Sequence, residues 1–370
     1  MSSVLPPTPT SPGVGIRRKG PKTLPRLPLS AFSPPNSGTS DRFPLPPSPS
    51  TVHPERVVDA NVALTDDDVS VARWKKNAGE VFAGRVGGLV VILPNAGPNV
   101  KEVVSRLAAD KAQTSVLSAV VPFRLDAAPD ESVSAVLAGS TIPISLATTF
   151  DANTTSQHAS TLKWALQQGR PVDIDIQVDL SDEVFETLED LLSKATTDLT
   201  KVPPIILCAP IGFIYTFLAR ILTVCVANLL PPPHQLELPI VKLMNHPVYR
   251  RFQAQVAALS LIPQLYIKYL PPYWEAPPAI PSDETPTLEG SDSRQQKEWK
   301  RRIKMYLGPV MEAFGFQRII FGSSPSKSSK STINAGDWYE LARESLAELG
   351  VEQESVDAVF SATAFGVYKS

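Results

Sequence analysis

The chain has 370 residues, with 35 lysines and arginines against 37 acidic residues, a net charge of −2 and a pI near 6.1. This length accommodates one large domain or two small ones, and the balanced charge argues against a nucleic-acid protein held by phosphate contacts. Cys208 and Cys225 lie in apolar runs, which indicates reduced thiols of an intracellular protein rather than a disulfide framework. The four histidines form no H-x-H or H-E-x-x-H pattern, which argues against a histidine-rich metal site.

Residues 1–55 are rich in proline and serine and lack aliphatic periodicity, so we predict a disordered tail before a domain over residues 56–370. The polyproline character suits a partner with an SH3 or WW domain, and a plain solubilising extension is the simpler alternative. No apolar secretory segment is visible, and prolines oppose the amphipathic helix of a mitochondrial leader. The prediction is a cytoplasmic protein, with a mitochondrial location as the less favoured alternative.

From residue 56 onward, short apolar runs alternate with helical patterns, as in βα units around a parallel sheet. Eight strands rich in valine and isoleucine are predicted, at 57–62, 89–93, 116–121, 142–146, 172–178, 204–209, 239–243 and 318–322. Eight strands with helical returns predict an α/β fold of the (β/α)₈ TIM-barrel type. The alternative is a doubly wound open sheet, but the glycine-rich stretch 84–88 precedes a strand instead of following one.

Two of the returning segments carry clear helix signals. After the fifth strand, Ser181 is the expected N-cap of a helix whose apolar face contains Val184 and Leu188. After the eighth strand, Asp337 and Glu340 form a capping pattern, and Gly350 is expected to end that helix.

Two segments depart from this alternation of strands and helices. The nearly uncharged run 203–230 allows a membrane association through 205–230, but Pro210 divides it and Arg220 would lie in the bilayer. A strand followed by a barrel helix is therefore favoured, and the narrow polar stripe of that helix suits a homo-oligomer contact. Residues 271–296 carry six prolines and no periodicity, which predicts a loop insertion.

Several predicted strands resemble, in order, strands of one protein family. Residues 314–324 (FGFQRIIFGSS) resemble the last strand of the amidohydrolase-related barrels that include 2-pyrone-4,6-dicarboxylate hydrolase, where the pattern ends in G-[ST]-D. The similarity extends to 57–63 (VVDANVA, like I-D-x-H-x-H), 173–178 (DIDIQV), 204–211 (PIILCAPI), 241–243 (VKL, like V-K-L-S) and the closing helix 360–368. The motifs keep their order over residues 56–369. The resemblance implies a metal-dependent hydrolase barrel.

The chain departs from this family where the family carries its metal and catalytic residues. Asn61 and Ala63 stand in place of two histidines. Cys208 and Ala209 replace an Asp-His pair, and Ser324 replaces the catalytic aspartate. A catalytic zinc needs about three protein ligands, and alanine offers none. We therefore expect no metal and no cofactor, and whether the chain is an enzyme stays open at this point.

Other polar residues remain at the predicted carboxyl ends of the strands, where barrel active sites lie. The candidate catalytic residues are Asp59, Asp175, Lys242 and His246, and the candidate ligand-binding residues are Asn61, Gln177, Ser324, Lys327 and Lys330. The competing interpretations are structural: Asp173 and Asp175 paired with Lys242 inside the barrel, Cys208 as an inert thiol, and a mobile Ser-rich loop around the two last lysines.

Two classes of function follow from this pattern. The favoured hypothesis is a non-catalytic barrel that binds a small carboxylated or anionic ligand, or a partner. The alternative is a metal-free hydrolase or lactonase that acts on a carboxylated ring compound, and a membrane-associated protein is the third hypothesis.

Overall fold

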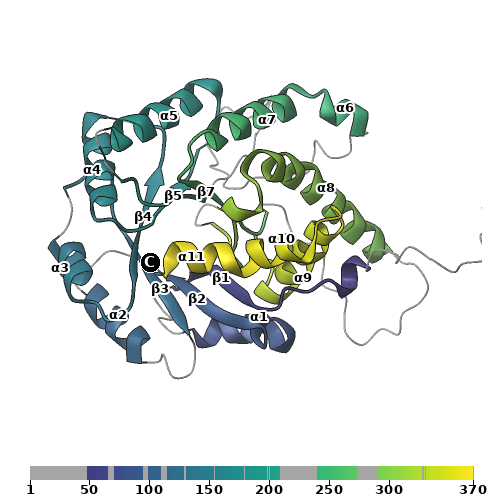
Figure 1. Ribbon diagram of the computed structural model, residues 1–370, viewed down its shortest axis with the longest axis horizontal. Helices are drawn as coiled ribbons and strands as arrows, with labels where there is room; N and C mark the ends of the chain where they lie inside the picture. Colours follow the sequence, from purple (N-terminus) through teal and green to yellow (C-terminus); the bar gives the residue numbers. More distant parts are fainter. Residues whose placement is uncertain are drawn as a thin grey trace, which may run out of the picture. The chain divides into compact units, whose positions relative to one another are not determined.

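Eight parallel strands form a single sheet whose order follows the sequence, so each strand lies beside the next one along the chain (Figure 1). The computed structural model describes residues 48–65, 71–94, 99–109, 115–128, 131–153, 155–178, 180–197, 199, 201–208, 240–272, 291–326, 329 and 331–369. The strands are β1 (Val57–Ala63), β2 (Val86–Ile92), β3 (Val116–Pro122), β4 (Ile144–Phe150), β5 (Val172–Ile176), β6 (Ile205–Cys208), β7 (Leu265–Tyr269) and β8 (Ile319–Phe321).

The first and last strands also meet. Just past β8, the Ser324 amide donates to the Asn61 carbonyl of β1 at 2.9 Å. The sheet is therefore a nearly closed barrel, as the alternation of buried strands and helices predicts, and the open-sheet alternative is excluded.

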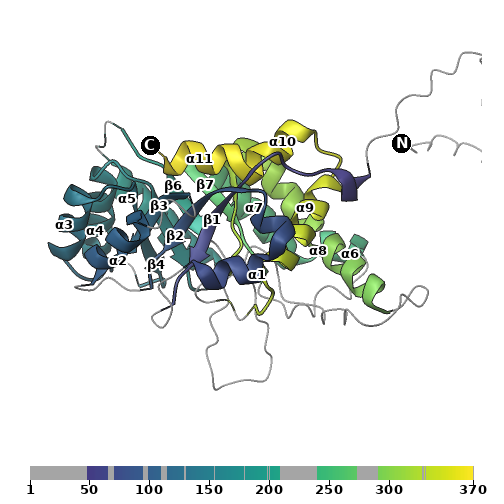
Figure 2. The same cartoon turned by 90° about the horizontal axis from the view of Figure 1, so that it is seen from below.

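The helices follow the strands, and most of them lie on the outer side of the barrel, while the last helix lies across one end of it (Figures 1 and 2). They are α1 (Ala72–Ala83), α2 (Val100–Ala109), α3 (Glu131–Gly139), α4 (Ser156–Gln167), α5 (Asp182–Thr196), α6 (Ile240–Met244), α7 (Pro247–Ser260), α8 (Ser291–Phe314), α9 (Ala335–Ala347), α10 (Gln353–Asp357) and α11 (Thr363–Tyr368). Short 3₁₀ turns occupy Pro49–Thr51 and Phe316–Arg318, and a π-helical turn (Ala358–Ala362) joins α10 to α11.

An aromatic cluster packs α1 and α9 against β8, where β8 lies beside β1. Phe82 of α1 stacks on Tyr339 of α9 at a centroid distance of 4.7 Å and meets Phe321 of β8 edge-on at 6.0 Å. The two helices approach so closely that a Cβ at Gly336 would lie 2.6 Å from the Ala78 carbonyl oxygen. Glycine is therefore required at this position to let the α9 backbone pack on α1.

The interior of the barrel is closed at one end by the last helix. Ala364, Val367 and Tyr368 of α11 form one buried cluster with inward-facing strand residues such as Val58 and Leu117. These two are the second residues of β1 and β3, so α11 covers the amino ends of the strands (Figure 2). The carboxyl ends lie opposite, where a barrel usually builds its site.

Seven of the eight predicted strands are confirmed in place, within a few residues at their ends. The strand predicted at 239–243 is wrong: residues 240–244 form the short helix α6, and the seventh strand is β7, at Leu265–Tyr269. Residues 265–269 (LYIKY) alternate Leu265, Ile267 and Tyr269 on one face, which is the pattern of a strand.

The helix signals are confirmed at one helix and corrected at another. Ser181 caps α5 by accepting a hydrogen bond from the Val184 amide at 3.3 Å. At α9 the cap is Asn334, whose side chain accepts from the Asp337 amide at 2.8 Å, so the prediction of a cap at Asp337 is wrong. Gly350 lies just beyond this helix with φ of +74°, a conformation that suits glycine.

The described chain begins at residue 48, before the predicted start of the domain, and it is held on the barrel by a buried arginine. Arg343 of α9, 2% exposed, donates to the carbonyls of Pro49 and Val52 at 3.0 and 2.7 Å. Further along, the Glu55 amide donates to Asp357 at 2.9 Å. Residues 48–55 therefore behave as part of the domain.

Some predicted features lie outside the described residues. These are the rest of the tail, most of the apolar run 203–230, Cys225, Ala209, Lys327 and Lys330. Of the predicted loop insertion 271–296, the last six residues belong to α8. Among the residues that the structure describes, no helix is long and apolar enough to cross a membrane.

Candidate functional site

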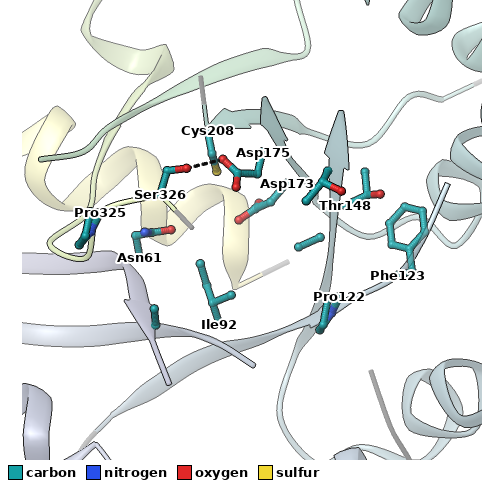
Figure 3. Close-up of a pocket in the computed structure, with 13 residues that line it drawn as sticks. Asn61, Ile92, Pro122, Phe123, Thr148, Asp173, Asp175, Cys208, Pro325 and Ser326 are labelled. Atoms are coloured by element: carbon teal, nitrogen blue, oxygen red, sulfur yellow. Dashed lines mark hydrogen bonds between the residues drawn. The ribbon is translucent and has the colours of Figure 1, made fainter. Parts of the chain in front are cut away.

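A hollow of about 70 Å³ lies at the carboxyl ends of the strands (Figure 3). This volume has room for a few water molecules or a small organic group. We call this hollow the mouth pocket. The residues that line it are Asn61, Ala63, Ile92, Pro122, Phe123, Ala147, Thr148, Thr149, Asp173, Asp175, Cys208, Pro325 and Ser326.

The period of β5 places two aspartates toward the barrel interior, one above the other. Because side chains alternate along a strand, Asp173 and Asp175 share one face. In the ladder to β6, Asp173 pairs with Ile206 and Asp175 with Cys208. In the ladder to β4, Thr149 stands opposite Asp175. The sequence prediction that both aspartates share a face is confirmed.

The deeper aspartate belongs to a buried ion pair. Lys268 of β7, 1% exposed, places its Nζ 2.6 Å from Asp173 Oδ2 and 3.0 Å from Asn61 Oδ1. Burial by itself would lower the pKa of Lys268, but the charge of Asp173 and its hydrogen bond outweigh this effect, and the pKa lies above its ordinary value. The ammonium is therefore charged at neutral pH and bound on two sides.

The closing helix supplies the other partner of this aspartate. Tyr368 of α11 donates from its hydroxyl to Asp173 Oδ1 at 2.8 Å, and its ring lies 5.6 Å from Lys268 Nζ. Burial, with the nearby charge of Asp173, raises the pKa of Tyr368 far above its usual range, so the phenol remains a donor. Asp173, Lys268, Tyr368 and Asn61 form a satisfied polar layer below the mouth pocket, called the polar floor below.

Lys242 is not part of this layer. The prediction that it lies on a strand beside Asp173 is wrong, because Lys242 is exposed on α6. Sequence reasoning did not identify Lys268, although a lysine between Ile267 and Tyr269 in an apolar run is a signal for a paired, inward-facing charge.

Asn61 and Ser324 join the two edges of the barrel. Asn61 Nδ2 donates to the Ser324 carbonyl at 2.7 Å, and the Ala63 amide donates to Ser324 Oγ at 3.1 Å. Asn61 lines the mouth pocket, while Ser324 lies outside its lining and Pro325 and Ser326 take its place.

Asp59 is completely buried and points away from the mouth pocket. Its carboxylate accepts from the Ser323 amide at 2.8 Å, from Trp74 Nε1 at 2.8 Å and from the Asn61 amide at 3.1 Å, and it also contacts the Ser323 hydroxyl. Burial raises the pKa of Asp59, while these hydrogen bonds act in the opposite direction. The structure places this predicted catalytic residue behind β1, where it binds the loop after β8 to α1.

Asp175 is the half-buried carboxylate of the mouth pocket. Ser326 donates to its Oδ1 at 2.6 Å, the bond drawn in Figure 3, and Gln177 donates to its Oδ2 at 3.3 Å. Two sequence candidates, Asp175 and Gln177, are thus together at the end of β5. Ser326 was not predicted, because it lies 151 positions from Asp175 in the sequence. It reaches β5 only because the barrel closes and brings the loop after β8 near this strand.

The contacts of His246 and Cys208 give these two residues structural roles. His246 lies outside the lining of the mouth pocket and caps α7, where its Nδ1 accepts from the Val248 amide at 3.3 Å. Cys208 lines the mouth pocket but is only 5% exposed, and burial raises the pKa of its thiol far above the usual range. The sulfur is therefore a protonated thiol at neutral pH, in agreement with an inert core cysteine.

The donor set of the mouth pocket does not fit a catalytic metal ion. Ala63 has no donor atom, the Asn61 side-chain oxygen faces an ammonium, and the Cys208 sulfur is protonated. Among the residues that the structure describes, no group of three histidines, cysteines or carboxylates is placed to hold a metal.

Comparison with known proteins supports the barrel at the level of fold. No family model and no curated protein matches the sequence. Solved structures that match include an amidohydrolase from Burkholderia multivorans with bound zinc, at 14% identity and a TM-score of 0.50, which covers 85% of this chain and 99% of that one. Another is a protein from Pseudomonas putida assigned as a 2-pyrone-4,6-dicarboxylic acid hydrolase, at 15% identity and a TM-score of 0.50, with 85% and 97% covered.

These likenesses confirm the fold that the sequence motifs implied. At such identities they show the architecture alone, and function has to be argued from the residues in the mouth pocket.

Proposed function

We propose that this chain is a metal-free (β/α)₈ barrel that binds a small molecule in its mouth pocket and does not hydrolyse it. One observation carries the proposal: the Lys268 ammonium occupies the position between Asn61 of β1 and Asp173 of β5. Asn61 stands where the resembling family has a metal-binding histidine, and here its oxygen faces a fixed positive charge. A divalent cation at this place would be repelled by that charge.

The rest of the mouth pocket supports the same proposal. A working hydrolase needs a base near the reacting water, and imidazole is the usual choice at neutral pH. No histidine is among the described residues that line the mouth pocket, and its cysteine is protonated. What remains is an apolar hollow with one accessible carboxylate, which is the composition of a binding site.

Metal content and metal-dependent stability test the proposal. The full chain, purified without chelators, should contain far less than one equivalent of zinc or manganese. Its melting temperature should not rise when either ion is added, because only a ligand that binds the native state stabilises it. Near-stoichiometric metal with a matching rise in melting temperature, or hydrolysis of an ester panel that metal stimulates, would overturn the proposal.

A second candidate rests on Asp175 alone. A half-buried carboxylate at the carboxyl end of β5 is placed to activate a water, as in a metal-free hydrolase or lactonase. Asp175→Asn would then abolish turnover of a lactone panel, while His246→Ala would leave it unchanged because His246 lies outside the mouth pocket. Turnover that survives Asp175→Asn would reject this candidate.

A further inference from the structure

A short amino-terminal segment lies across the outside of the barrel, where donors of the barrel bind its main-chain oxygens. We call residues 48–55 the strap, and it lies beside α9 and α10, in purple in Figures 1 and 2. In addition to the two hydrogen bonds from Arg343, Gln353 of α10 donates to the His53 carbonyl at 2.8 Å. Arg85, which precedes β2, donates to the Pro54 carbonyl at 3.3 Å. The polar contacts of the strap are therefore made largely by its backbone.

The side chain of His53 lies among the charged groups that bind the strap. Its Nδ1 atom is buried and has no hydrogen-bond partner among the described residues. The positive charges of Arg343 and Arg85 act on the imidazole, while Glu340 and Glu344 act in the opposite direction and are both paired with Arg343. Burial, followed by the charges of the two arginines, lowers the pKa of His53 below its ordinary value of 6.5. The imidazole of the docked strap is therefore neutral at neutral pH.

Protonation of this ring disturbs the contact between strap and barrel. In the imidazolium form both ring nitrogens carry a proton, so the buried Nδ1 becomes a donor without an acceptor, close to two guanidinium groups. A buried charge that lacks a partner is costly. We infer that the strap is a pH-sensitive clasp, in which protonation of His53 releases residues 48–55 from α9 and α10 while the barrel stays folded.

The other titratable groups at this interface do not change charge in the same range of pH. Asp357 of α10 accepts from the Glu55 amide at 2.9 Å, and carboxylates titrate well below histidine. Tyr339 of α9 lies near the same two arginines, and burial raises the pKa of its phenol to about 12. A release between neutral and mildly acidic pH is therefore assigned to His53.

The direction of the effect follows from the lowered pKa. Docking of the strap is strongest above pH 6.5, and it weakens as the pH falls from 6.5 through the pKa of the docked His53. Release adds Pro49 and Pro54 to the proline-rich sequence that precedes the strap, so a polyproline-binding partner gains a longer segment in mild acid. The clasp and the mouth pocket are different parts of the molecule, and the two proposals can fail separately.

Hydrogen–deuterium exchange of the full chain tests the release, with each rate corrected for the intrinsic effect of pH on exchange. The reporters are the amides of Thr51, Val52 and Glu55, which donate to Ser48, Pro49 and Asp357. Their protection should fall several-fold between about pH 7.5 and 5.5, the window in which histidine titrates. Protection of β4 should stay constant over the same window, which separates release of the strap from unfolding of the barrel.

Two variants assign the effect to one histidine. His53→Gln keeps a polar side chain without a titratable ring, so the protection of its strap should not change between the two pH values. The control is His246→Asn, which removes a histidine from α7 and keeps an N-cap acceptor there, and its strap should behave like that of the wild type. Constant protection in the wild type, an equal loss in His53→Gln, or a parallel loss in β4 would overturn the clasp.

Proton NMR of the imidazole resonances gives a readout that does not depend on how well the strap of a variant docks. The chain has four histidines, and the resonance that is missing in His53→Gln identifies His53. In the wild type this resonance should titrate with a pKa below 6.5. Titration at or above 6.5 would overturn the inference, even where His53→Gln leaves the strap unprotected at both pH values.

Discussion

Asp173 and Asp175 lie two residues apart on the same face of β5, yet their surroundings are opposite. Asp173 is 2% exposed, and its two oxygens accept from Tyr368 and Lys268. Asp175 is half-buried, lines the mouth pocket and accepts from Ser326 at its rim. One strand thus carries a carboxylate of the polar floor and a carboxylate of the binding surface.

The difference shows that depth along the strand decides the role of an acid in this barrel. A buried charge is tolerated only when it is paired and hydrogen-bonded, which the polar floor provides from three other elements. At the mouth, an acid keeps part of its hydration and is accessible to a ligand. The predictions below test this contrast, from the largest expected effect on stability to the smallest.

The largest effect is expected when the floor loses its cation. Lys268→Met should lower the free energy of unfolding by about 3–5 kcal/mol, because it leaves Asp173 buried without its counter-ion. Urea denaturation followed by circular dichroism measures the change. Lys242→Met is the matched control: this lysine is exposed on α6, and its loss should change stability by less than about 0.5 kcal/mol. Equal effects of the two variants would contradict the polar floor.

The same pair predicts a dependence on pH. The folded pKa of Lys268 lies above its ordinary value of 10.5, so its contribution is fully present below that value and is lost as the pH rises through the folded pKa. The stability difference between wild type and Lys268→Met should therefore be constant from neutral pH to about 9 and shrink at more alkaline pH. A difference that already shrinks near neutral pH would show that the ammonium is not held as described.

A smaller effect is expected at the closing helix. Tyr368→Phe removes the hydrogen bond to Asp173 and should cost about 1.5–3 kcal/mol, the range for a bond to a charged group. Tyr306→Phe is the control, since the Tyr306 hydroxyl is buried and has no partner among the described residues. Its removal should leave the unfolding free energy unchanged or raise it slightly. If both variants are equally destabilised, the bond to Asp173 contributes nothing specific.

Much of the barrel could be predicted from the sequence because its strands are marked by local sequence patterns. Runs of valine and isoleucine at regular spacing mark β1 to β6 without knowledge of what lies beside them. The same local reasoning identified Asp173 and Asp175 on one face of β5, and it identified Asn61 as a mouth residue.

The polar floor could not be predicted in the same way, because its contacts join distant parts of the chain. Lys268 meets Asp173 across 95 positions and Asn61 across 207, and Tyr368 meets Asp173 across 195. A lysine can reach Asp173 across the barrel interior from a strand that does not adjoin β5, so assigning Lys242 to this role depended on placing the seventh strand correctly. The boundary of the tail depended likewise on Arg343, a contact that only the folded chain creates.

The smallest effect on stability is expected at the mouth pocket. The change from aspartate to asparagine, made once at Asp173 and once at Asp175, compares the polar floor with the mouth pocket. Asp173→Asn leaves Lys268 buried without a counter-ion and should cost about 3–5 kcal/mol, whereas Asp175→Asn should cost less than about 1 kcal/mol. Ser326 can still donate to the amide oxygen of an asparagine at 175, and this position is only half-buried, unlike Asp173. Urea denaturation of the two variants side by side measures the contrast. A cost at 175 equal to that at 173 would mean that Asp175 is a structural residue, and it would remove the reason to expect a ligand above it.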